Sequence, residues 1–326
     1  MSSRTDMCES PILTLTFLGD TTADLVLDEL HGRGVPVVRL DPGVDFDSDA
    51  RMSALLTDRG LSGAIHTPTR QIDLAAVRSV YWRRPTPYGG TGPGVTVEEQ
   101  FTNSQSRAGY AGVLANLPGT LYVNHPWRNR DAEYKNAQLT AAACVGMHVP
   151  ESLITTSPDD ARRFITRRGP AVYKPLRLVH LPGDDGKGRT VWVRVVDPAE
   201  IDERIGVCPH FFQSCVDKVA DVRLAAVGDE LFATRIDIDG GHLDWREDYH
   251  RLSYTPVPVP GTIRTAVRAF LDAFGLTFSA FDFALDADGR WWFLECNPNG
   301  QWAFVDAPTR QAITEALADT LQKGRT

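Results

Sequence analysis

The stretch Phe281-Asp-Phe-Ala-Leu-Asp-Ala-Asp-Gly-Arg-Trp-Trp-Phe-Leu-Glu-Cys-Asn-Pro-Asn-Gly300 decides how the rest of the chain is interpreted. Two apolar, aromatic runs flank Asp286-Ala-Asp-Gly289, which is a cluster of turn-forming residues. This pattern predicts a β-hairpin. We expect its strands to pair with Leu285 opposite Arg290.

Three polar side chains lie within this predicted hairpin. The expected register places Asp282 opposite Phe293 and diagonal to Glu295. Because side chains alternate along a strand, Asp282, Glu295 and Asn297 should project from one face. The diagonal spans roughly 7–8 Å between backbone positions, so two carboxylates can share one cation across it. Two carboxylates and an amide oxygen suit Mg²⁺, whereas the alternative, a hairpin whose acids face water, is disfavoured by the apolar residues around them.

The composition sets limits on the class of protein. The chain has 326 residues, of which 42% are hydrophobic and 23% charged, as expected of a globular protein with two or three cores. A net charge of −8 disfavours nucleic-acid binding. The five cysteines are scattered and indicate a reducing compartment. With no apolar run as long as a membrane span, the sequence predicts a soluble, cytoplasmic protein with neither nucleic-acid nor membrane partners.

The first third of the chain has a strand–helix–strand rhythm. Apolar runs at Ile12–Leu18 and Val35–Leu40 flank a predicted helix at Ala23–His31, which indicates a small α/β layer with a parallel sheet. A further strand at Val77–Trp82 leads into Arg83-Arg84. Ligands of open α/β sheets bind beyond the carboxyl ends of strands, so this pair could grip a carboxylate or phosphate. A solvated pair packed by the tryptophan is the equally open alternative.

Two lysines are candidates for binding phosphates. Lys135 lies in the first half of a predicted helix, Asp131–Val145, where a cation opposes the helix dipole. Lys174 lies in a predicted strand, Ala171–Leu176. The glycine-rich loop His180–Arg189 could fold over phosphates with its backbone N–H groups, or it could be a plain hairpin tip.

Three arginines form a second candidate set. Arg223 and Arg235 lie in the predicted strands Asp221–Val227 and Leu231–Ile238, and Arg246 lies in a charged loop after them. Arginines on strands are rarely buried without an anionic partner. We therefore expect the three to converge near the metal site and to bind phosphates or a carboxylate.

In their order along the chain these features resemble an ATP-grasp enzyme. The resemblance covers residues 80–305 and includes the segments Phe212-Gln-Ser-Cys-Val-Asp-Lys218 and Asp221-Val-Arg223. It implies an α/β (α+β) fold of three parts. These would be an N-terminal pre-ATP-grasp α/β domain, a central subdomain and a C-terminal antiparallel-sheet subdomain, at 1–125, 126–209 and 210–326.

Within that superfamily the sequence is similar to the ribosomal-peptide maturases that make microviridins and other graspetides. The matching segments are Tyr81-Trp-Arg-Arg-Pro85 and Asp244-Trp-Arg246. The resemblance implies a macrocyclase that uses ATP and Mg²⁺ to activate Asp or Glu side chains and joins them to Thr, Ser or Lys. Its partner would be a ribosomal precursor peptide with a leader and an acidic, Thr/Ser-rich core; a homodimer is left open.

Three sets of site residues follow from the resemblance. One set would bind the phosphates, adenine and ribose of ATP: Lys135, Lys174, Gln213, Cys215, Val216, Asp217 and Lys218. A second set would bind Mg²⁺: Asp282, Glu295 and Asn297. A third set would bind the γ-phosphate or the acceptor carboxylate: Arg223, Arg235 and Arg246. The sequence departs from related ligases in two respects. Gln213–Val216 lacks the acidic residue that is common there, and the first domain diverges so far that the residues that recognise the peptide cannot be transferred.

Two other functions remain open from the sequence alone. A carboxylate–amine ligase of the same fold would add an amino acid to a protein, a peptide or a small metabolite. A nucleotide-binding scaffold would have lost catalysis, although the intact carboxylate and amide set counts against this alternative. The mass of the product distinguishes the two enzymes, since a cross-link loses one water and a ligation adds a residue.

Overall fold

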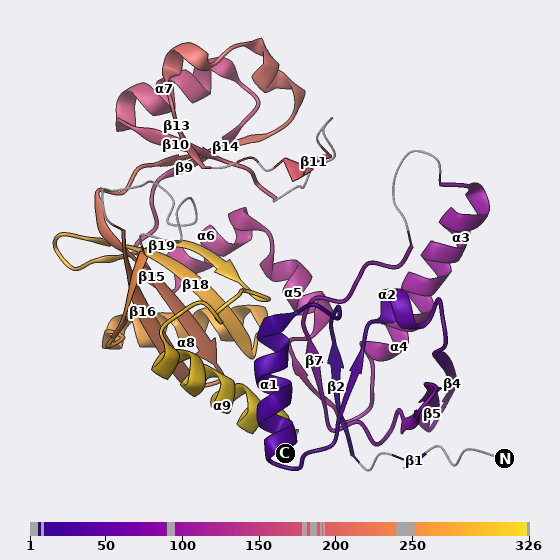
Figure 1. Ribbon diagram of the computed structural model, residues 1–326. Helices are drawn as coiled ribbons and strands as arrows, with labels where there is room; N and C mark the ends of the chain where they lie inside the picture. The colour runs from indigo at the N-terminus through magenta and orange to yellow at the C-terminus, as the bar shows by residue number, and fades with distance from the viewer. Residues whose placement is uncertain are drawn as a thin grey trace.

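The computed structural model describes residues 6–7, 10–89, 95–177, 181–182, 188–189, 191, 193–238 and 252–324 (Figure 1). Arg246 and most of the glycine-rich loop, two elements of the expected site, lie outside these residues. None of the helices in the described ranges is long and apolar enough to span a membrane.

The first part of the chain is built on a parallel sheet, as predicted. Its strands occur in the order β3 (Val37–Leu40), β2 (Ile12–Leu15), β7 (Ser79–Trp82) and β8 (Leu121–Val123). Helix α1 (Thr21–Gly32) follows β2 and is capped by the side chain of Asp20. The carboxyl ends of β2 and β7 are adjacent, so Asp20 and the residues after Trp82 meet at one edge of the sheet.

A second, smaller sheet and a group of helices complete this part. The sheet has the order β1 (Asp6–Met7), β6 (Arg70–Asp73), β5 (Gly60–His66) and β4 (Arg51–Thr57). The helical segments are α2 (Pro42–Asp45), α3 (Val97–Ser106), the π-helix η1 (Arg107–Ala111) and α4 (Gly112–Leu114). A capping box between Thr96 and Glu99 starts α3.

The middle of the chain forms an antiparallel sheet covered by one helix. The strand order is β13 (Arg194–Val196), β10 (Ala171–Lys174), β14 (His210–Ser214) and β9 (Ser152–Thr155), with α7 (Pro158–Arg168) packed on it. Short 3₁₀ turns are η2 (Pro198–Glu200) and η3 (Glu203–Val207), and β11 (Leu181–Pro182) pairs with β12 (Gly188–Arg189). The domain divisions at 125 and 209 stay predictions. Strand β14 begins after residue 209, yet it pairs with β9 and β10, which lie before that residue.

The helix predicted at Asp131–Val145 is instead two helices. They are α5 (Pro126–Ala132) and α6 (Lys135–Cys144). Tyr134 is extended between them, and the carbonyl of Ala132 accepts a hydrogen bond at 2.6 Å from a side chain of α6 instead of continuing the helix. Because of this break, Lys135 is the first residue of α6.

The C-terminal part is a five-stranded antiparallel sheet between helices. The strand order is β17 (Leu252–Val257), β16 (Glu230–Ile238), β15 (Lys218–Val227), β18 (Phe278–Asp286) and β19 (Trp291–Asn297). One face packs on α6 and on α8 (Gly261–Phe274), which ends at left-handed Gly275. Part of the other face packs on α9 (Ala307–Lys323), which also contacts α1, so one core joins the two ends of the chain (Figure 1).

The predicted hairpin is present, but the predicted register is wrong. Leu285 pairs with Trp291 rather than Arg290, because Asp286 accepts hydrogen bonds from backbone groups of the turn and draws Arg290 into it. A bulge then adds one more residue on β19, so Asp282 lies directly opposite Glu295. The two shifts add up to two residues, which leaves Asp282 and Glu295 on the same face.

A buried asparagine after β8 ties the parallel sheet to the hairpin. The Oδ1 atom of Asn124 accepts from the backbone N–H groups of Thr277 and Phe278, each at 2.8 Å. Its Nδ2 atom donates to the carbonyls of Phe278 and Pro298 at 2.8 and 3.1 Å. Asn124 thus satisfies four backbone groups at the start of β18 and beyond the end of β19.

We expect Asn124→Ala to lower the free energy of unfolding by about 2–4 kcal/mol, because buried backbone groups would lose their partners. Urea denaturation checks this. Asn116→Ala is the matched control, since Asn116 is exposed and its side chain makes one hydrogen bond within the described residues, to the carbonyl of Gly112. Equal effects of the two substitutions would contradict the role of Asn124.

Candidate active site

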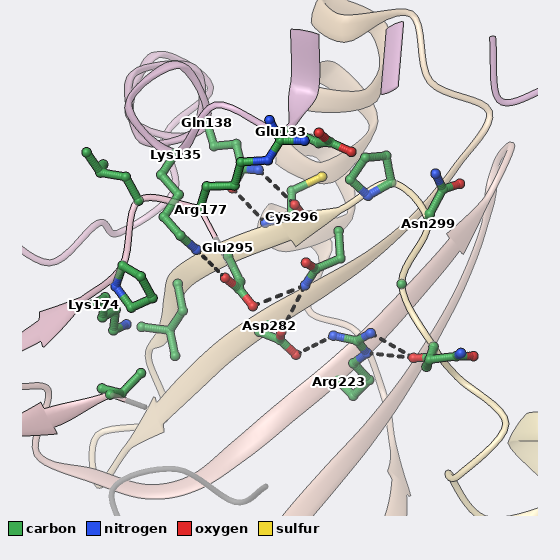
Figure 2. A pocket seen from close by; sticks show the side chains of 18 of the residues that line it. Glu133, Lys135, Gln138, Lys174, Arg177, Arg223, Asp282, Glu295, Cys296 and Asn299 are labelled. Atoms are coloured by element: carbon green, nitrogen blue, oxygen red, sulfur yellow. Dashed lines mark hydrogen bonds and ion pairs between the residues drawn. The ribbon is translucent and has the colours of Figure 1, made fainter. Parts of the chain in front are cut away.

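A cavity of about 1110 Å³ lies where the two antiparallel sheets and the linking helices meet (Figure 2). Lys174 lines it from β10 of the middle sheet, and Lys135 lines it from the linking helix α6. Asp282 and Glu295 line it from the hairpin, and Arg84 lines it from the edge of the parallel sheet. Four segments that are far apart in the sequence therefore contribute charged groups to one space.

The three expected metal ligands lie together in this cavity. Nδ2 of Asn297 is 3.2 Å from Oδ2 of Asp282 and 3.2 Å from Oε1 of Glu295. Alternation along β19 brings Glu295 and Asn297 to the cavity face, while Cys296 between them is buried on the opposite face. The expected clustering of the three side chains is confirmed.

Two cations neutralise the paired carboxylates. Nη1 of Arg223 lies 2.7 Å from Oδ1 of Asp282, which is its partner in the β15–β18 register. Nζ of Lys135 lies 2.6 Å from Oε2 of Glu295. Both acids are partly buried, and like charges on facing strands repel each other, so these ion pairs offset the repulsion between the two carboxylates.

The donor set fits a hard divalent cation. The amide of Asn297 already places a hydrogen-bond donor between the two carboxylates, which is where a positive charge would be best stabilised. Rotating that amide would direct its oxygen to the same point, and oxygen and nitrogen are interchangeable in such an assignment. Two carboxylates and one amide oxygen are ligands typical of Mg²⁺.

The nucleotide set lies mostly along one wall of the cavity. Nζ of Lys174 donates to Oε1 of Gln213 at 2.8 Å, and Nε2 of Gln213 donates to Oγ of Ser152 at 3.0 Å. Lys218 lines the same cavity and pairs with Asp221 at 2.6 Å. Gln213 is buried, so within the described residues its side chain holds Lys174 in place.

The remaining members of this set differ in position. Cys215 and Val216 line the cavity, whereas Asp217 is exposed and does not. Burial raises the pKa of the Cys215 thiol, and it raises the pKa of the Cys296 thiol to about 12. Neither thiol is therefore a thiolate at neutral pH, and neither provides a nucleophile in the described part of the site.

The expectation that the arginines converge is wrong for Arg235. Arg223 pairs with Thr234 across β15 and β16, and Arg235 pairs with Val222, so the two arginines lie on opposite faces of the sheet. Arg235 forms a two-pronged ion pair with Asp237, its neighbour two residues along the strand. The two-residue turn after Val227 already implied this register, which the sequence argument did not use.

Sequence reasoning missed Gln138 on α6. Strand β19 is at the edge of its sheet, and Gln138 pairs with that edge as another strand would. Its Oε1 accepts from the backbone N–H of Cys296 at 2.9 Å, and its Nε2 donates to the carbonyl of Cys296 at 2.8 Å (Figure 2). Gln138 lies one turn after Lys135. One face of α6 therefore both pairs with the carboxylate of Glu295 and binds the backbone between Glu295 and Asn297.

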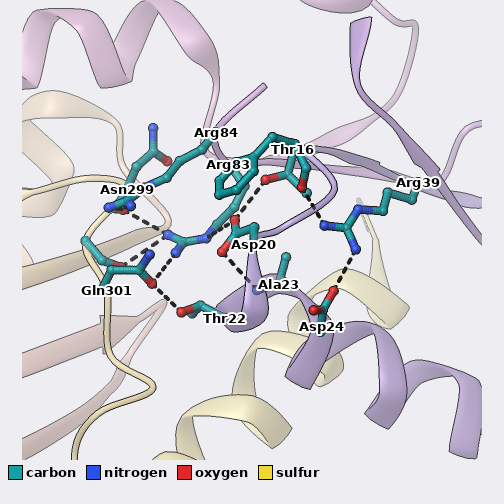
Figure 3. Close-up of polar contacts among 12 residues, drawn as sticks. Thr16, Asp20, Thr22, Ala23, Asp24, Arg39, Arg83, Arg84, Asn299 and Gln301 are labelled. Carbon is teal, nitrogen blue, oxygen red and sulfur yellow. Dashed lines mark hydrogen bonds and ion pairs between the residues drawn. The ribbon is translucent and has the colours of Figure 1, made fainter. Parts of the chain in front are cut away.

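Arg83 has a structural place that the sequence did not reveal. It is 1% exposed, which excludes a solvated side chain. Its Nε lies 3.2 Å from Oδ2 of Asp20, and its other nitrogens donate to the carbonyls of Asn299 and Gly300 and to Oε1 of Gln301 (Figure 3). Arg83 therefore joins the edge of the parallel sheet to the loop that follows β19.

The comparisons with known proteins agree with this geometry. No protein-family model matches the sequence, and no curated protein does so. A solved structure of a Chryseobacterium gregarium RiPP-associated ATP-grasp ligase, in complex with ADP and a leader and core peptide, is similar over 97% of this chain and 99% of its own, with a TM-score of 0.86 and 23% identity.

Two further solved structures are similar over nearly their full lengths. Macrocyclase MdnB from Microcystis aeruginosa MRC has a TM-score of 0.77 and 25% identity, covering 96% of this chain and 99% of its own. The ATP-grasp ligase PsnB, complexed with a minimal precursor, Mg and ADP, has a TM-score of 0.74 and 21% identity, covering 99% and 100%. The chain has the ATP-grasp fold, and the resemblance to the ATP-grasp ligases of ribosomal-peptide maturation is confirmed at the level of the structure.

Proposed function

We propose that this protein is an ATP-dependent peptide macrocyclase. It activates Asp or Glu side chains of a ribosomal precursor peptide and joins them to Thr, Ser or Lys side chains of the same peptide. The observation that carries the proposal is the carboxylate and amide cluster of Asp282, Glu295 and Asn297, facing two lysines in one large cavity. The similarity to peptide ligases over nearly the whole chain supports the substrate class.

The chemistry needs no covalent enzyme intermediate. A carboxylate oxygen of the peptide attacks the γ-phosphorus of ATP, ADP leaves, and an acyl phosphate forms. A hydroxyl or amine of the peptide then attacks the acyl carbon, loses its proton and expels phosphate. The net change is one water lost from the peptide and one ATP converted to ADP and phosphate.

Each part of the cavity has a role in this scheme. Lys174 and Lys135 bind the phosphates, since phosphoryl transfer depends mainly on positioning and on neutralising charge. Gln213 holds Lys174, and the segment that contains Cys215 and Val216 forms the wall against the base. Arg223 donates to Asp282 and to the carbonyl of Gln301, so its guanidinium nitrogens are already used. We therefore propose that Arg223 positions the metal ligand Asp282 and does not bind the substrate.

Asp282, Glu295 and Asn297 would hold Mg²⁺. When bound there, the ion would supply positive charge that offsets the charge of the phosphates during transfer. The ammonium of Lys135 pairs with Glu295 at this place, so it adds positive charge beside both the carboxylate and the phosphates.

The partner we propose is a precursor peptide with a leader and an acidic core rich in Thr and Ser. The net charge of −8 makes the positive cavity important for such a substrate, because the rest of the surface repels it. We place the reaction in the cytoplasm, where ATP is supplied, and we leave a homodimer open.

The reaction itself can be tested with a short acidic, Thr/Ser-rich peptide encoded beside the gene. Incubation with ATP and Mg²⁺ should give products lighter by whole waters, about 18 Da each, with one ADP for each ring. Mild base in methanol should open esters and leave amides intact. A product heavier by one residue would identify an amino-acid ligase instead and overturn the macrocyclase.

Removing one metal ligand should abolish turnover without unfolding the chain. Mutating a residue that only supports a metal ligand typically lowers metal affinity or activity about 10–100-fold, and losing a ligand itself should cost more. Glu295→Gln or Asp282→Asn should therefore slow Mg²⁺-dependent ADP release at least about 100-fold. Asp288→Asn is the matched control, because it changes an exposed carboxylate at the tip of the same hairpin. Wild-type rates in either ligand variant would remove the metal assignment.

Gln138→Ala should weaken Mg²⁺ binding because the backbone between two ligands loses its support. We expect the Mg²⁺ concentration for half-maximal ADP release to rise about 10-fold. Gln100→Ala is the control, since Gln100 is exposed on α3 and its side chain binds only the carbonyl of Val95 among the described residues. A lower melting temperature with an unchanged Mg²⁺ requirement would mean that Gln138 supports the fold alone.

A further inference from the structure

Adjacent arginines at the edge of the parallel sheet have opposite environments. Arg83 is buried and has Asp20 as its counter-ion. Arg84 is exposed at the cavity, and its Nε and Nη2 donate to a single backbone carbonyl, that of Asn299, at 3.3 and 2.9 Å (Figure 3). Its Nη1 has no hydrogen-bond partner among the described residues. Arg84 therefore keeps a donor available to a ligand.

Arg84 forms no ion pair with a carboxylate of the described residues, and the nearby Asp20 is already paired with Arg83. The other two arginines at this place have acids of their own, since Arg83 pairs with Asp20 and Arg223 with Asp282. Glu133 lines the same cavity but forms no ion pair with Arg84. Desolvation lowers the pKa of the Arg84 guanidinium, and the charge of Arg83 lowers it further. A positive group held against other positive groups at a cavity wall favours an anion as its ligand.

A buried asparagine beside Arg84 supplies an unused acceptor. Asn129 on α5 is 4% exposed and lines the cavity. Its Nδ2 donates to Oδ1 of Asn299 at 3.2 Å, but its Oδ1 has no hydrogen-bond partner in the described part of the chain. A buried polar atom without a partner is costly, so a ligand that brings an N–H group to it is stabilised.

Both groups contact one residue, Asn299, which lies two positions after the metal ligand Asn297. Arg84 contacts the backbone oxygen of Asn299 and Asn129 contacts its side-chain oxygen. A cation with a free donor and an acceptor therefore lie on either side of one residue, next to the metal set. An acidic residue within a peptide presents the complementary pair, a side-chain carboxylate and a backbone N–H.

We propose that Arg84 and Asn129 form a subsite for an acidic residue of the peptide substrate, in which Arg84 binds the side-chain carboxylate and Asn129 accepts a hydrogen bond from the peptide N–H. This subsite rests on the proposed function, and it assigns the carboxylate to one member of the Arg83-Arg84 pair rather than to Arg223, Arg235 or Arg246. Arginine suits the task, since its planar fork matches the two oxygens of a carboxylate.

Two small probes that differ only in charge test the subsite without the natural peptide. They are N-acetylglutamic acid N-methylamide and its glutamine analogue, each titrated in the presence of ADP and Mg²⁺ and followed by ligand-observed NMR. The wild type should prefer the acid. Arg84→Met should weaken binding of the acid about 10- to 100-fold and leave the neutral probe unchanged, because a hydrogen bond to a charged group is lost.

Two further variants separate the roles. Arg84→Lys should retain part of the preference, since it keeps the charge and loses the fork. Asn129→Leu should weaken both probes alike. Arg268→Met is the matched control, because Arg268 is a surface arginine of α8 that pairs with Asp229 and does not line the cavity. No preference for the acid in the wild type, or equal losses of both probes in Arg84→Met, would overturn the subsite.

The failure of this inference differs from failure of the proposed function. If the wild type closes rings and Arg84→Met does so with an unchanged KM for the peptide, the subsite is wrong and the macrocyclase stands. If no peptide is condensed while Arg84 still determines the preference for the acid probe, the macrocyclase is wrong and the carboxylate subsite stands.

Discussion

Two carboxylates that face each other on neighbouring strands repel, and the rest of the site depends on how that repulsion is offset. Asp282 and Glu295 are directly opposed on the hairpin, with the amide of Asn297 between them. Arg223 neutralises one acid from β15, and Lys135 neutralises the other from α6. Because the two cations come from different parts of the chain, the electrostatics of the hairpin couple the position of α6 to that of the sheet.

Consistent with that coupling, side chains from other parts of the chain bind backbone groups of the hairpin. β19 is an edge strand, and an edge strand has unpaired N–H and C=O groups. Gln138 satisfies those of Cys296, and Asn124 satisfies groups at the start of β18 and beyond the end of β19. Arg83 holds the loop that follows. Side chains therefore bind the edge strand where a further strand would pair, and the cavity lined by Asp282, Glu295 and Asn297 stays open.

The arginines show how partners decide roles. Arg235 and Arg223 lie on adjacent strands, yet one pairs with Asp237 on the far face and the other with Asp282 at the cavity. Arg83 and Arg84 are neighbours in sequence, yet only Arg83 forms an ion pair with a carboxylate of the described residues. An arginine with its own acid supports structure, whereas one without an acid is suited to bind a ligand.

The sequence by itself determined the hairpin, the parallel sheet and the shared face of Asp282, Glu295 and Asn297. The prediction of the shared face was correct although the predicted register was wrong. The turn and the bulge together shift the pairing by two residues, and side chains alternate with a period of two. Only the tertiary structure decided the partners of Lys135, Gln138 and Arg84. Those contacts join residues that lie about 160 or more positions apart, and the local patterns that predict strands and helices carry no information on how such distant elements dock.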